Sequence, residues 1–531
     1  MITRRGFLLA SAQTVAALPF AGVTAAKTRI GLVESTHRRL AQPASPEDPL
    51  DYDRVRAMVW KAIDYAGGMA DRIRPGSWVV VKPNIVFLRP QQGYRSGDIT
   101  DMRVTQAVVE YIARNAQPAR ITVAEGGSYR SLHDPAASDV VTQGGRRADA
   151  AGFDWGTAEF PGYGGTLGAM LREFASAFPG KRFDYIDLSY DAVRDASGAL
   201  RRIEVPRTAR WVGGFGARTD YFVTNTIRNC DYLVSVPVMK VHEQCGITAC
   251  LKNYVGTAPR EAYAGPGGFW NARLHDEHSL EGRIDSFITD LASFHPPDFS
   301  VVDGIRGLQY SEHDNGRPDQ MLRNNLVLAS RDPVAADALV AQLLGFNPWD
   351  IEFLHMAEQR DMGCMNLEKA NVIGDDPARL AGHWGKPKGW YGRANREWLV
   401  TGDPNASMAS WSRCTTPTDT LHFARVVRET LRPQTSYGAA VRVMAAGHRN
   451  AYLWVGAHGR VVAQLNGETV MTEESLTHSR IGQFQKPVEL RSGENLLVFR
   501  VEPVRDPARL SVLLVGPRND GDTVEGIRWT A

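Results

Sequence analysis

The sequence predicts an α/β domain with a mostly parallel sheet and crossover helices, followed by a C-terminal all-β sandwich domain. Up to residue 373, short runs of β-branched residues alternate with amphipathic helical segments, whereas short alternating strands follow one another near the C-terminus. At 531 residues the chain is also too long for one ordinary core. We therefore expect a signal segment at 1–26, the α/β domain at 27–373, a connector at 374–420 and the β-sandwich at 421–531.

The first 26 residues have the pattern of an export signal. Paired arginines, Arg4 and Arg5, precede the weakly apolar stretch FLLASAQTVAALPFAGV, and the small residues TAA end at Ala26. This order is typical of a twin-arginine (Tat) signal peptide. A stable membrane anchor needs about 20 strongly apolar residues, whereas this stretch contains Ser, Gln, Thr and Pro. We therefore expect the Tat export machinery as a partner, a periplasmic or secreted location, and no stable membrane anchor.

Strand and helix patterns alternate along the α/β domain. Segments that fit buried strands lie at 28–35, 76–84, 119–127, 230–240, 298–307 and 324–332, and helical segments lie at 51–70, 104–116 and 333–345. Asp332 is expected to cap the last helix, with Pro333 at its first position. Ligands of open parallel sheets bind beyond the carboxyl ends of the strands, so the loops KPN, EGGSYRSLHD, MKVHEQC and DGIRG should converge on one side.

The segment MKVHEQCGITACLKN, residues 239–253, carries reactive residue types directly after a buried strand. Histidine at a strand end suits proton transfer or metal binding, and a buried lysine is suited to act as a base or nucleophile. The predicted catalytic residues are His242, Lys252, Glu243 and Lys240. The alternative is an ordinary polar loop, in which these side chains form surface ion pairs.

Polar residues in the neighbouring loops extend this candidate site. Basic and amide groups bind carboxylates and other anions, and the predicted substrate-binding residues are Lys82, Asn84, Asp98, Arg103, Asn253 and Arg306. The same loops offer ligands for a divalent metal of unspecified identity, with His242, His275 and Asp303 as the predicted set. The sequence HDEH at 275–278 is not HExxH, so a zinc protease is not predicted.

Composition and motifs argue against several other classes. A formal net charge of +2 without a long basic run argues against a nucleic-acid partner. The five cysteines include no CxxC pair, so no iron-sulfur cluster is expected. GxGxxG and GxxxxGK[ST] do not occur, so NAD binding is not expected. Cys245 and Cys250 are expected to be small buried thiols or, after export, a disulfide.

Several motifs resemble, in their order, the domain-of-unknown-function 362 family. They are VVVKPNIV, VAEGG, CDYLVSVPVMKVHEQCGITACLKNYVGTAP, SVVDGIRGL and LASRDPVAADALVAQLLGF, and they span about residues 30–363. Many members carry a ferredoxin-like cysteine segment that this chain lacks, so the resemblance implies no electron-transfer role here. The family name supplies no reaction.

A more distant similarity is to the nickel-pincer lactate racemase superfamily. GDITDMRVTQAVVEYI resembles its Asp-Ile-Thr turn before a helix, and VAEGGSYRSLHD resembles its histidine-containing loop. His242 stands ten residues before Lys252, as a histidine does before the cofactor-bearing lysine of that superfamily. The sequence GITAC replaces the glycine-rich run that normally precedes this lysine, which argues against a nickel-pincer nucleotide.

Short strands separated by Gly and Asn turns predict the C-terminal sandwich. They lie at 439–447, 451–457, 460–470, 486–503 and 509–517. LNGETV followed by LRSGENLLVFRV resembles the galactose-binding-like modules of carbohydrate-active enzymes. This resemblance implies either contact with a carbohydrate or a purely structural role, and the sequence leaves both open.

Together these observations predict an exported enzyme that acts on a small hydroxylated, acidic or saccharide substrate. The predicted chemistry is metal-assisted proton abstraction leading to elimination or epimerisation. One alternative is a glycoside hydrolase, which needs two carboxylates about 5 to 9.5 Å apart, and Glu243 with Asp303 is the pair considered. Another is a periplasmic binding or cofactor-delivery protein without turnover. The sequence does not predict an oligomeric state.

Overall fold

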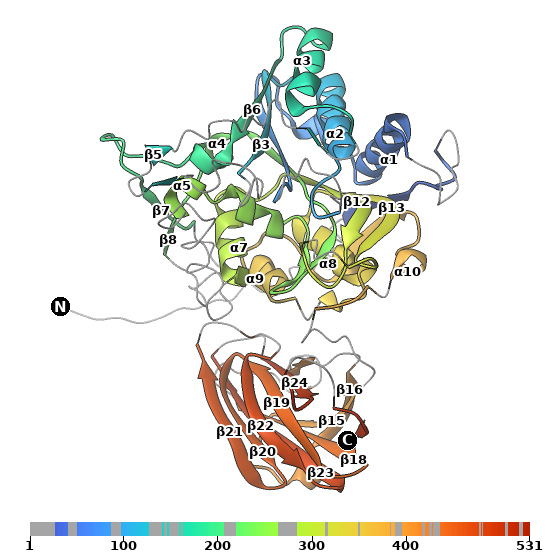
Figure 1. Ribbon diagram of the computed structural model, residues 1–531, viewed down its shortest axis with the longest axis vertical. Coiled ribbons are helices and arrows are strands. Elements are labelled where there is room, and N and C mark those ends of the chain that lie inside the picture. The colour runs from blue at the N-terminus through green and yellow to red at the C-terminus, as the bar shows by residue number, and fades with distance from the viewer. Residues whose placement is uncertain are drawn as a thin grey trace, which may run out of the picture.

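A computed structural model describes two parts of the chain, an α/β part and a β part (Figure 1). The predicted signal at 1–26 and His275 lie outside the described residues. None of the helices in the described residues is long and apolar enough to cross a membrane. The described residues are 27–40, 50–86, 97–126, 141–142, 146–147, 159–160, 163–206, 219–263, 284–313, 317–348, 351–382, 384–387, 396–416, 420–423, 427, 436–476, 479, 482–504, 508–519 and 524–530.

An eight-stranded sheet with the order β14-β1-β13-β12-β9-β2-β3-β6 is the centre of the α/β part. Neighbouring strands are parallel, except that β13 runs antiparallel to β1 and β12. The predicted fold class of this part, a mostly parallel sheet with helices, is therefore confirmed. The strands are β1 (Thr28–Glu34), β2 (Trp78–Pro83), β3 (Arg120–Glu125), β6 (Arg182–Asp187), β9 (Tyr232–Val236), β12 (Phe299–Leu308), β13 (Met321–Ser330) and β14 (Ala370–Gly374).

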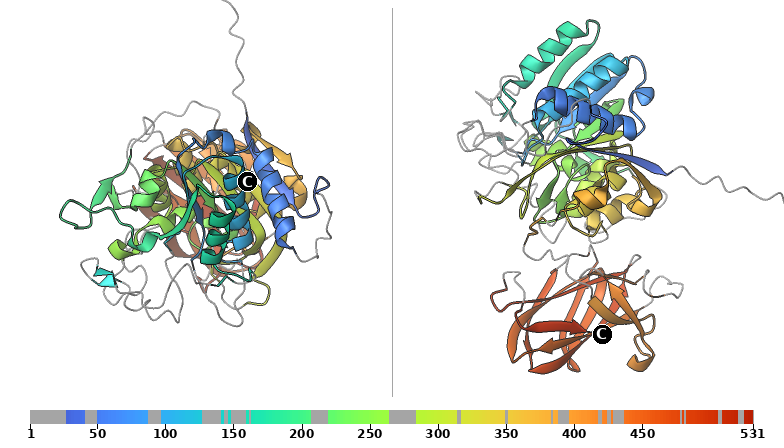
Figure 2. Two further views of the ribbon diagram at one scale, coloured as in Figure 1. Left: turned by 90° about the horizontal axis from the view of Figure 1, so that it is seen from above. Right: turned by 90° about the vertical axis from the view of Figure 1, so that its right-hand side faces the viewer.

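Helices cover both faces of this sheet, because successive side chains of a buried strand point to opposite faces. Val79 and Val81 of β2 pack in one core with α1, α2 and α3, whereas Val80 packs in the other core with α7, α8 and α9. The right-hand view of Figure 2 shows helices on either side of the sheet. These helices are α1 (Tyr52–Tyr65), α2 (Met102–Asn115), α3 (Leu167–Ala177), α7 (Ile284–Ser293), α8 (Pro333–Leu343) and α9 (Glu352–Gln359).

The predicted cap of α8 is present. Asp332 Oδ1 accepts a hydrogen bond from Ala335 N at 2.9 Å, and Pro333 occupies the first turn. The other carboxylate oxygen accepts from Cys364 N at 3.0 Å, so the cap also fixes the chain after α9. The smaller elements of the α/β part are α4 (Asn225–Asn229), α5 (Arg260–Tyr263), α10 (Pro377–Leu380) and the hairpins of β4 (Val141–Thr142) with β5 (Arg146–Arg147), β7 (Arg202–Glu204) with β8 (Asp220–Phe222), and β10 (Lys240–His242) with β11 (Gly246–Thr248).

The second part consists of two antiparallel sheets, as predicted for the C-terminal region. One sheet has the order β16-β15-β18-β23-β20-β21, with β25 paired to β18, and the other has the order β17-β24-β19-β22. A single hydrophobic core includes residues from both sheets. The strands are β15 (Arg396–Thr401), β16 (Ser412–Thr416), β17 (Thr420–His422), β18 (Tyr437–Ala445), β19 (Arg449–Ala457), β20 (Gly459–Leu465), β21 (Glu468–Ser475), β22 (Phe484–Leu490), β23 (Gly493–Pro503), β24 (Arg509–Val515) and β25 (Ile527–Thr530).

The β part starts earlier than the sequence indicates. β15 and β16 lie within 374–420, the range expected to be a connector, and Leu399 of β15 pairs with Ala440 of β18. Trp398 is fully buried in the core of the sandwich. Each of these strands is short, and the partner that continues the sheet lies far along the chain, so local alternation alone did not reveal them.

A buried ion pair joins the two parts. Arg509 of β24 contacts the carboxylate of Glu352 at the start of α9, and both residues are less than 10% exposed. Because buried charges need a partner, this contact fixes the sandwich against the α9 side of the α/β part, on the side where Figure 1 shows it.

Candidate functional site

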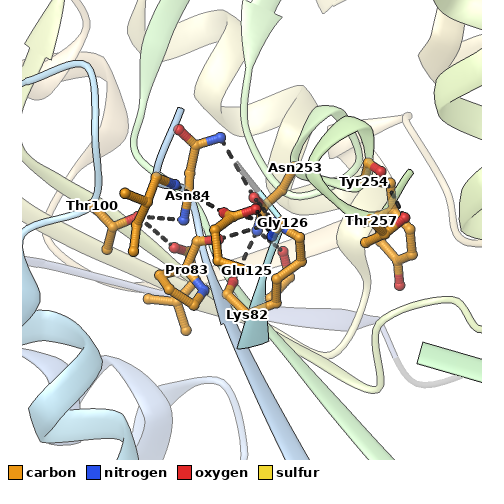
Figure 3. Close-up of polar contacts among 12 residues, drawn as sticks. Lys82, Pro83, Asn84, Thr100, Glu125, Gly126, Asn253, Tyr254 and Thr257 are labelled. Carbon is orange, nitrogen blue, oxygen red and sulfur yellow. Dashed lines mark hydrogen bonds and ion pairs between the residues drawn. The ribbon is translucent and has the colours of Figure 1, made fainter. Parts of the chain in front are cut away.

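Lys82, near the carboxyl end of β2, is an anchored cation. Its Nζ donates hydrogen bonds to Glu125 Oε2 at 2.9 Å, Asn253 Oδ1 at 2.9 Å and the Pro83 carbonyl at 3.0 Å (Figure 3). Burial lowers the pKa of Lys82, and the Glu125 carboxylate opposes this shift. An ammonium group has three hydrogens, so the protein itself uses all of them. In this arrangement Lys82 has no N–H left for the substrate contact predicted from the sequence.

Asn253 locks the 3-10 turn η3 (Lys252–Thr257) onto the strand ends. Its Nδ2 donates to the Lys82 carbonyl at 2.9 Å and to Ser235 Oγ at 3.0 Å. Its Oδ1 accepts from Lys82 Nζ. Both amide hydrogens are therefore used within the protein, and Asn253 positions the turn rather than offering donors to a substrate.

The approach of η3 to the Lys82–Glu125 pair requires glycine at position 256. A Cβ atom there would lie 2.3 Å from Glu125 Oε1 and 2.8 Å from Lys82 Nζ, and both of these side chains are buried. Gly126 N also donates to the Gly256 carbonyl at 3.2 Å. The two glycines thus let the end of β3 and the turn η3 come into backbone contact.

Asn84 offers an acceptor to a ligand. Its backbone N donates a hydrogen bond to Thr100 Oγ1 at 2.9 Å. Its Nδ2 lies 3.5 Å from Asn253 Oδ1. Its Oδ1 is buried and has no hydrogen-bond partner among the described residues. A buried acceptor left unpaired costs about 1 to 3 kcal/mol. A substrate hydroxyl would supply the missing hydrogen bond, as expected for the predicted substrate-binding role.

Lys240, on β10, is a second buried cation. Its side chain is 1% exposed, and Nζ donates to the main-chain carbonyls of Asp98 at 2.6 Å and Glu312 at 3.0 Å. Burial lowers the pKa of Lys240 to about 8, although the nearby charges of Asp98 and Glu312 oppose this shift. These two bonds use two of its three hydrogens, so Lys240 retains one donor for an anion.

Lys252, the first residue of η3, differs from both. Its side chain is only partly buried, and no hydrogen bond or ion pair joins it to a residue that the structure describes. Burial lowers its pKa. The charge of Lys252 in turn contributes to the lowered pKa values of Lys82 and Lys240, so the three ammonium groups share one electrostatic environment. Lys252 is therefore a partly buried lysine whose neutral form is favoured more than that of a lysine in water.

His242 at the end of β10 faces Glu312. Gln244 N donates to His242 Nδ1 at 3.1 Å, which places the hydrogen of the neutral ring on Nε2, and Nε2 lies 3.3 Å from Glu312 Oε1. The other oxygen of Glu312 accepts from Glu243 N at 3.0 Å. Glu243 itself is exposed, and partial burial together with the charge of Glu312 raises its pKa. His242 and Glu312 thus form a close pair of an imidazole and a carboxylate.

Asp337 of α8 fixes the backbone just before Lys252. Its carboxylate accepts from Cys250 N at 2.7 Å and from Leu251 N at 3.0 Å. Burial raises the pKa of Asp337 to about 7, against these hydrogen bonds. Cys250 and Cys245 are free, buried thiols, and burial raises the pKa of both. The carboxylate of Asp337 therefore sets the direction in which η3 starts.

Two other predicted site residues hold the fold nearby. Arg103 makes two hydrogen bonds to the carboxylate of Asp101, at 3.0 and 2.6 Å. Asp303 Oδ2 accepts from Asp101 N at 2.7 Å and Oδ1 accepts from Ile305 N at 2.9 Å, and burial raises the pKa of Asp303 to about 7. These contacts tie α2 to β12. They serve the loop structure rather than a substrate.

Asp98 and Arg306 are the remaining predicted substrate-binding residues. Asp98 contributes its carbonyl to Lys240, and its side chain is fully buried. Arg306 is partly buried on β12 and lies opposite Arg323 of β13. The structure thus brings Asp98 to Lys240 through its carbonyl and through the charge of its carboxylate, and it places Arg306 on the strand β12.

The described ligands do not fit a shared metal ion. Both nitrogens of His242 face protein partners, and both oxygens of Asp303 accept backbone N–H groups. Among the residues that the structure describes, no three His, Cys, Asp or Glu side chains are grouped to hold a metal. His275, the third predicted ligand, lies outside the described residues. A metal site that includes His275 stays a prediction.

Three important residues were not among the predicted site residues. Glu125 pairs with Lys82, Glu312 pairs with His242, and Asp337 holds the start of η3. Glu125 ends a predicted strand inside the motif VAEGG, so its position at a strand end was a usable signal. Glu312 lies in a loop after β12 and shows no pattern of its own.

Solved structures give only distant matches. A family 35 carbohydrate binding module from an environmental isolate matches with a TM-score of 0.15 and 16% identity, over 20% of this chain and 77% of the module. A β-glucosidase from Kluyveromyces marxianus matches with a TM-score of 0.20 and 9% identity, over 27% of this chain and 21% of the enzyme. At such scores we draw no argument about function from either.

Sequence comparisons are more specific. A thylakoid-associated protein of Synechocystis sp., sll1697, is 24% identical over 299 residues, which cover 56% of this chain and 71% of that protein. The profile of the domain of unknown function DUF362 matches a shorter range than the motifs suggested. That range contains Lys240, His242 and Lys252, but neither Lys82 nor Glu125. The chain thus carries a DUF362 domain at residues 192–342.

Proposed function

We propose that the chain is an exported enzyme that abstracts a proton next to the carboxyl or carbonyl group of a small acidic, hydroxylated or saccharide substrate. Elimination or epimerisation would follow, and Lys252 is the proposed base. The observation that carries this proposal is Lys252, a partly buried residue whose side chain lacks a hydrogen-bond or ion-pair partner among the described residues and whose pKa is lowered by burial. A base must be unprotonated near the working pH, and this environment favours that form.

The neighbouring cations supply the electrostatic part of the proposal. Abstraction of a proton next to a carboxylate places additional negative charge on the substrate, and preorganised positive groups stabilise that charge. Lys240 is held by two hydrogen bonds and retains one donor for the substrate, whereas Lys82, whose charge is balanced by Glu125, holds the neighbouring turn in place. Their side chains are both buried, so little solvent reorganisation accompanies the reaction. An acidic substrate is therefore favoured over a neutral one.

Asn84 and His242 complete the proposed site. The unpaired Oδ1 of Asn84 would accept from a substrate hydroxyl, which favours a hydroxylated acid or a sugar acid. His242 has a hydrogen on Nε2 beside Glu312, and this pair is suited to return a proton to the substrate or to a leaving hydroxyl group. Carbohydrate contact by the sandwich is an additional part of this hypothesis, whereas the contacts of His242 and Asp303 within the protein do not favour them as metal ligands.

The test measures exchange of substrate hydrogen with solvent deuterium by mass spectrometry. The exported protein, with and without added divalent metals, is incubated in D₂O with a panel of small hydroxy acids and sugar acids, and with the matching neutral alcohols and sugars. We expect exchange or elimination for acids and none for the neutral compounds. Lys252→Met should abolish exchange, whereas Lys369→Met, which changes an exposed lysine far along the chain, should leave it unchanged.

Other outcomes would point to the alternative functions. Cleavage of glycosides that survives Lys252→Met would indicate a glycoside hydrolase, and tight ligand binding without turnover would indicate a binding or cofactor-delivery protein. Elemental analysis of the exported protein tests the metal. Its intact mass tests both removal of residues 1–26 and a covalent group on Lys252, so each part of the hypothesis has its own measurement.

A further inference from the structure

A cysteine, a histidine and an aspartate lie together near the amino ends of two strands, whereas the lysines lie near the carboxyl ends. Cys230 lies shortly before β9, which starts at Tyr232, and His295 and Asp298 lie in the segment that leads into β12, which starts at Phe299. β9 and β12 are parallel neighbours. The amino ends of these strands therefore carry this group, whereas the candidate site lies beyond the carboxyl ends, and nothing in the proposed function uses it.

The three side chains form a connected row. Cys230 Sγ lies 3.7 Å from His295 Nδ1, and His295 Nε2 lies 3.1 Å from Asp298 Oδ2. The same aspartate oxygen accepts from Leu233 N at 2.8 Å, which fixes the carboxylate. Tyr254 OH donates to the His295 carbonyl, which fixes the histidine backbone. A thiol beside an imidazole that a carboxylate orients is the arrangement of an activated nucleophile.

The histidine is positively charged in this arrangement. Burial acts to lower the pKa of His295, but the hydrogen bonds to Asp298 and Cys230 outweigh it and raise the pKa to about 10. His295 Nδ1 lies 3.7 Å from Cys230 Sγ, so this cationic ring is placed directly beside the sulfur. Sγ also lies 3.6 Å from the Ile227 carbonyl, which a neutral thiol would use as acceptor.

The other cysteines of the chain lack this environment. Burial raises the pKa values of Cys245 and Cys250, and it raises that of Cys414 to about 11. The pKa of Cys364 is also raised, chiefly by burial. Cys364 and Cys414 are nevertheless more exposed than Cys230, which is 6% exposed. If exposure controls reactivity, Cys364 and Cys414 should react before Cys230. If the neighbouring His295 controls it, Cys230 should react first.

We propose that Cys230 is a peroxide-reactive thiol that is assisted by the adjacent imidazole of His295, whose ring Asp298 orients. Cys230 is 6% exposed, so a small oxidant such as hydrogen peroxide would reach the sulfur more easily than a bulky one. The proposal is independent of the function proposed for the lysine site.

The reaction is a two-electron oxidation of sulfur. The thiolate of Cys230 attacks one oxygen of hydrogen peroxide, a sulfur–oxygen bond forms, and the oxygen–oxygen bond breaks. The sulfur becomes a sulfenic acid, and the departing hydroxide takes the proton of the His295 imidazolium to leave as water. Asp298 keeps the ring in the orientation that directs Nδ1 at the sulfur. A thiol reductant would restore the starting state.

The test is a competition among the cysteines of the full, reduced wild-type protein. The folded protein is exposed to limiting hydrogen peroxide with a metal chelator, and catalase stops the reaction at set times. The protein is then unfolded in urea with dimedone, so that the trap reaches every sulfenic acid equally, and each cysteine-containing peptide is quantified by mass spectrometry. We expect Cys230 to be trapped about tenfold faster than Cys364 and Cys414. Equal or faster trapping at Cys364 or Cys414 would overturn the proposal, because exposure would then control the reaction.

Variants separate activation from position. His295→Gln should lower the rate at Cys230 to that of Cys414, and an unchanged rate in the folded variant would also overturn the proposal. Cys230→Ser should remove the fast phase of peroxide consumption, whereas the matched Cys414→Ser should retain it. Circular dichroism reports whether His295→Gln folds, and if it does not, Asp298→Asn and the wild-type competition decide the outcome.

Discussion

Lys82 and Asn253, 171 residues apart, hold each other through two hydrogen bonds. Lys82 Nζ donates to Asn253 Oδ1 at 2.9 Å, and Asn253 Nδ2 donates to the Lys82 carbonyl at 2.9 Å. The side chain of one residue thus binds the side chain and the backbone of the other. Figure 3 shows Lys82 and Asn253 side by side. Because Lys252 precedes Asn253 in η3, this double contact also fixes the backbone of Lys252 relative to the end of β2.

Asn253→Leu should destabilise the α/β part by about 2 to 4 kcal/mol, because it leaves buried partners on Lys82 and Ser235 without their hydrogen bonds. Urea unfolding followed by circular dichroism measures the change. Asn371→Leu, at an exposed position of the edge strand β14, is the control and should change stability by less than about 0.5 kcal/mol. If Asn253→Leu lowers the free energy of unfolding by no more than the control does, the contact does not contribute to stability.

Asn84→Leu should weaken ligand binding without lowering the stability of the protein. It replaces a buried acceptor that has no partner among the described residues, so stability should stay the same or rise by about 1 kcal/mol. Binding of a hydroxylated acid should weaken by about 10- to 100-fold, measured by isothermal titration calorimetry. Loss of stability comparable with that of Asn253→Leu would argue that Asn84 is structural instead.

Gly256→Ala should disrupt the site through a single added methyl group. The new Cβ would lie 2.3 Å from Glu125 Oε1, so the Lys82–Glu125 pair or the turn η3 must shift, at a cost of about 1 to 3 kcal/mol. Thermal unfolding measures this cost. The matched control is Gly447→Ala, where the nearest atom, at 3.1 Å, is the flexible end of Arg449. Equal stability of the two variants would contradict the close approach.

Lys240 should make stability depend on pH in the alkaline range. Burial lowers its pKa from 10.5 to about 8, so the charged form is disfavoured in the folded state. This cost is complete below about pH 8 and disappears as pH rises towards 10.5, where the unfolded chain also loses its proton. Relative to Lys240→Met, the wild type should therefore gain on the order of 3 kcal/mol across this range.

Thermal unfolding of the wild type, Lys240→Met and the exposed-site control Lys369→Met at several pH values measures this difference. The difference between wild type and Lys369→Met should stay nearly constant with pH, since Lys369 is exposed. A constant difference between wild type and Lys240→Met would show that burial does not perturb Lys240.

Arg509→Met should loosen the contact between the two parts. Removing the cation beside the buried carboxylate of Glu352 should cost about 3 to 5 kcal/mol. The double variant with Glu352→Gln should recover part of that loss, because the uncompensated charge is gone. Differential scanning calorimetry measures both. Arg413→Met, which breaks an exposed pair with Glu397 at 3.9 Å, should cost less than about 1 kcal/mol.

Local patterns predicted the elements but not the pairing of charges. The β-branched run of β2 and the Asp332–Pro333 start of α8 depend on neighbouring residues, so the sequence predicted both correctly. The strand-end rule also placed Lys82 and Lys240 near one edge of the sheet. The roles of the predicted residues were harder to assign, because they depend on contacts between distant segments.

The lysines illustrate this limit. Lys82, Lys240 and Lys252 all looked like ligands or bases, but the first uses all three hydrogens within the protein and the second uses two. Only the positions of acceptors such as Glu125 and the Asp98 carbonyl distinguish them. Neither acceptor is close to its lysine in sequence.

The range of the DUF362 match does not coincide with a unit that folds alone. β9 lies inside residues 192–342, but its neighbour β2 lies outside, and so does β3. A fragment cut at those limits would expose the β2-facing edge of β9, a template for aggregation. It would also lack Lys82 and Glu125. A fragment for expression, or a segment chosen for comparison with relatives, should therefore include the whole eight-stranded sheet, from β1 to β14.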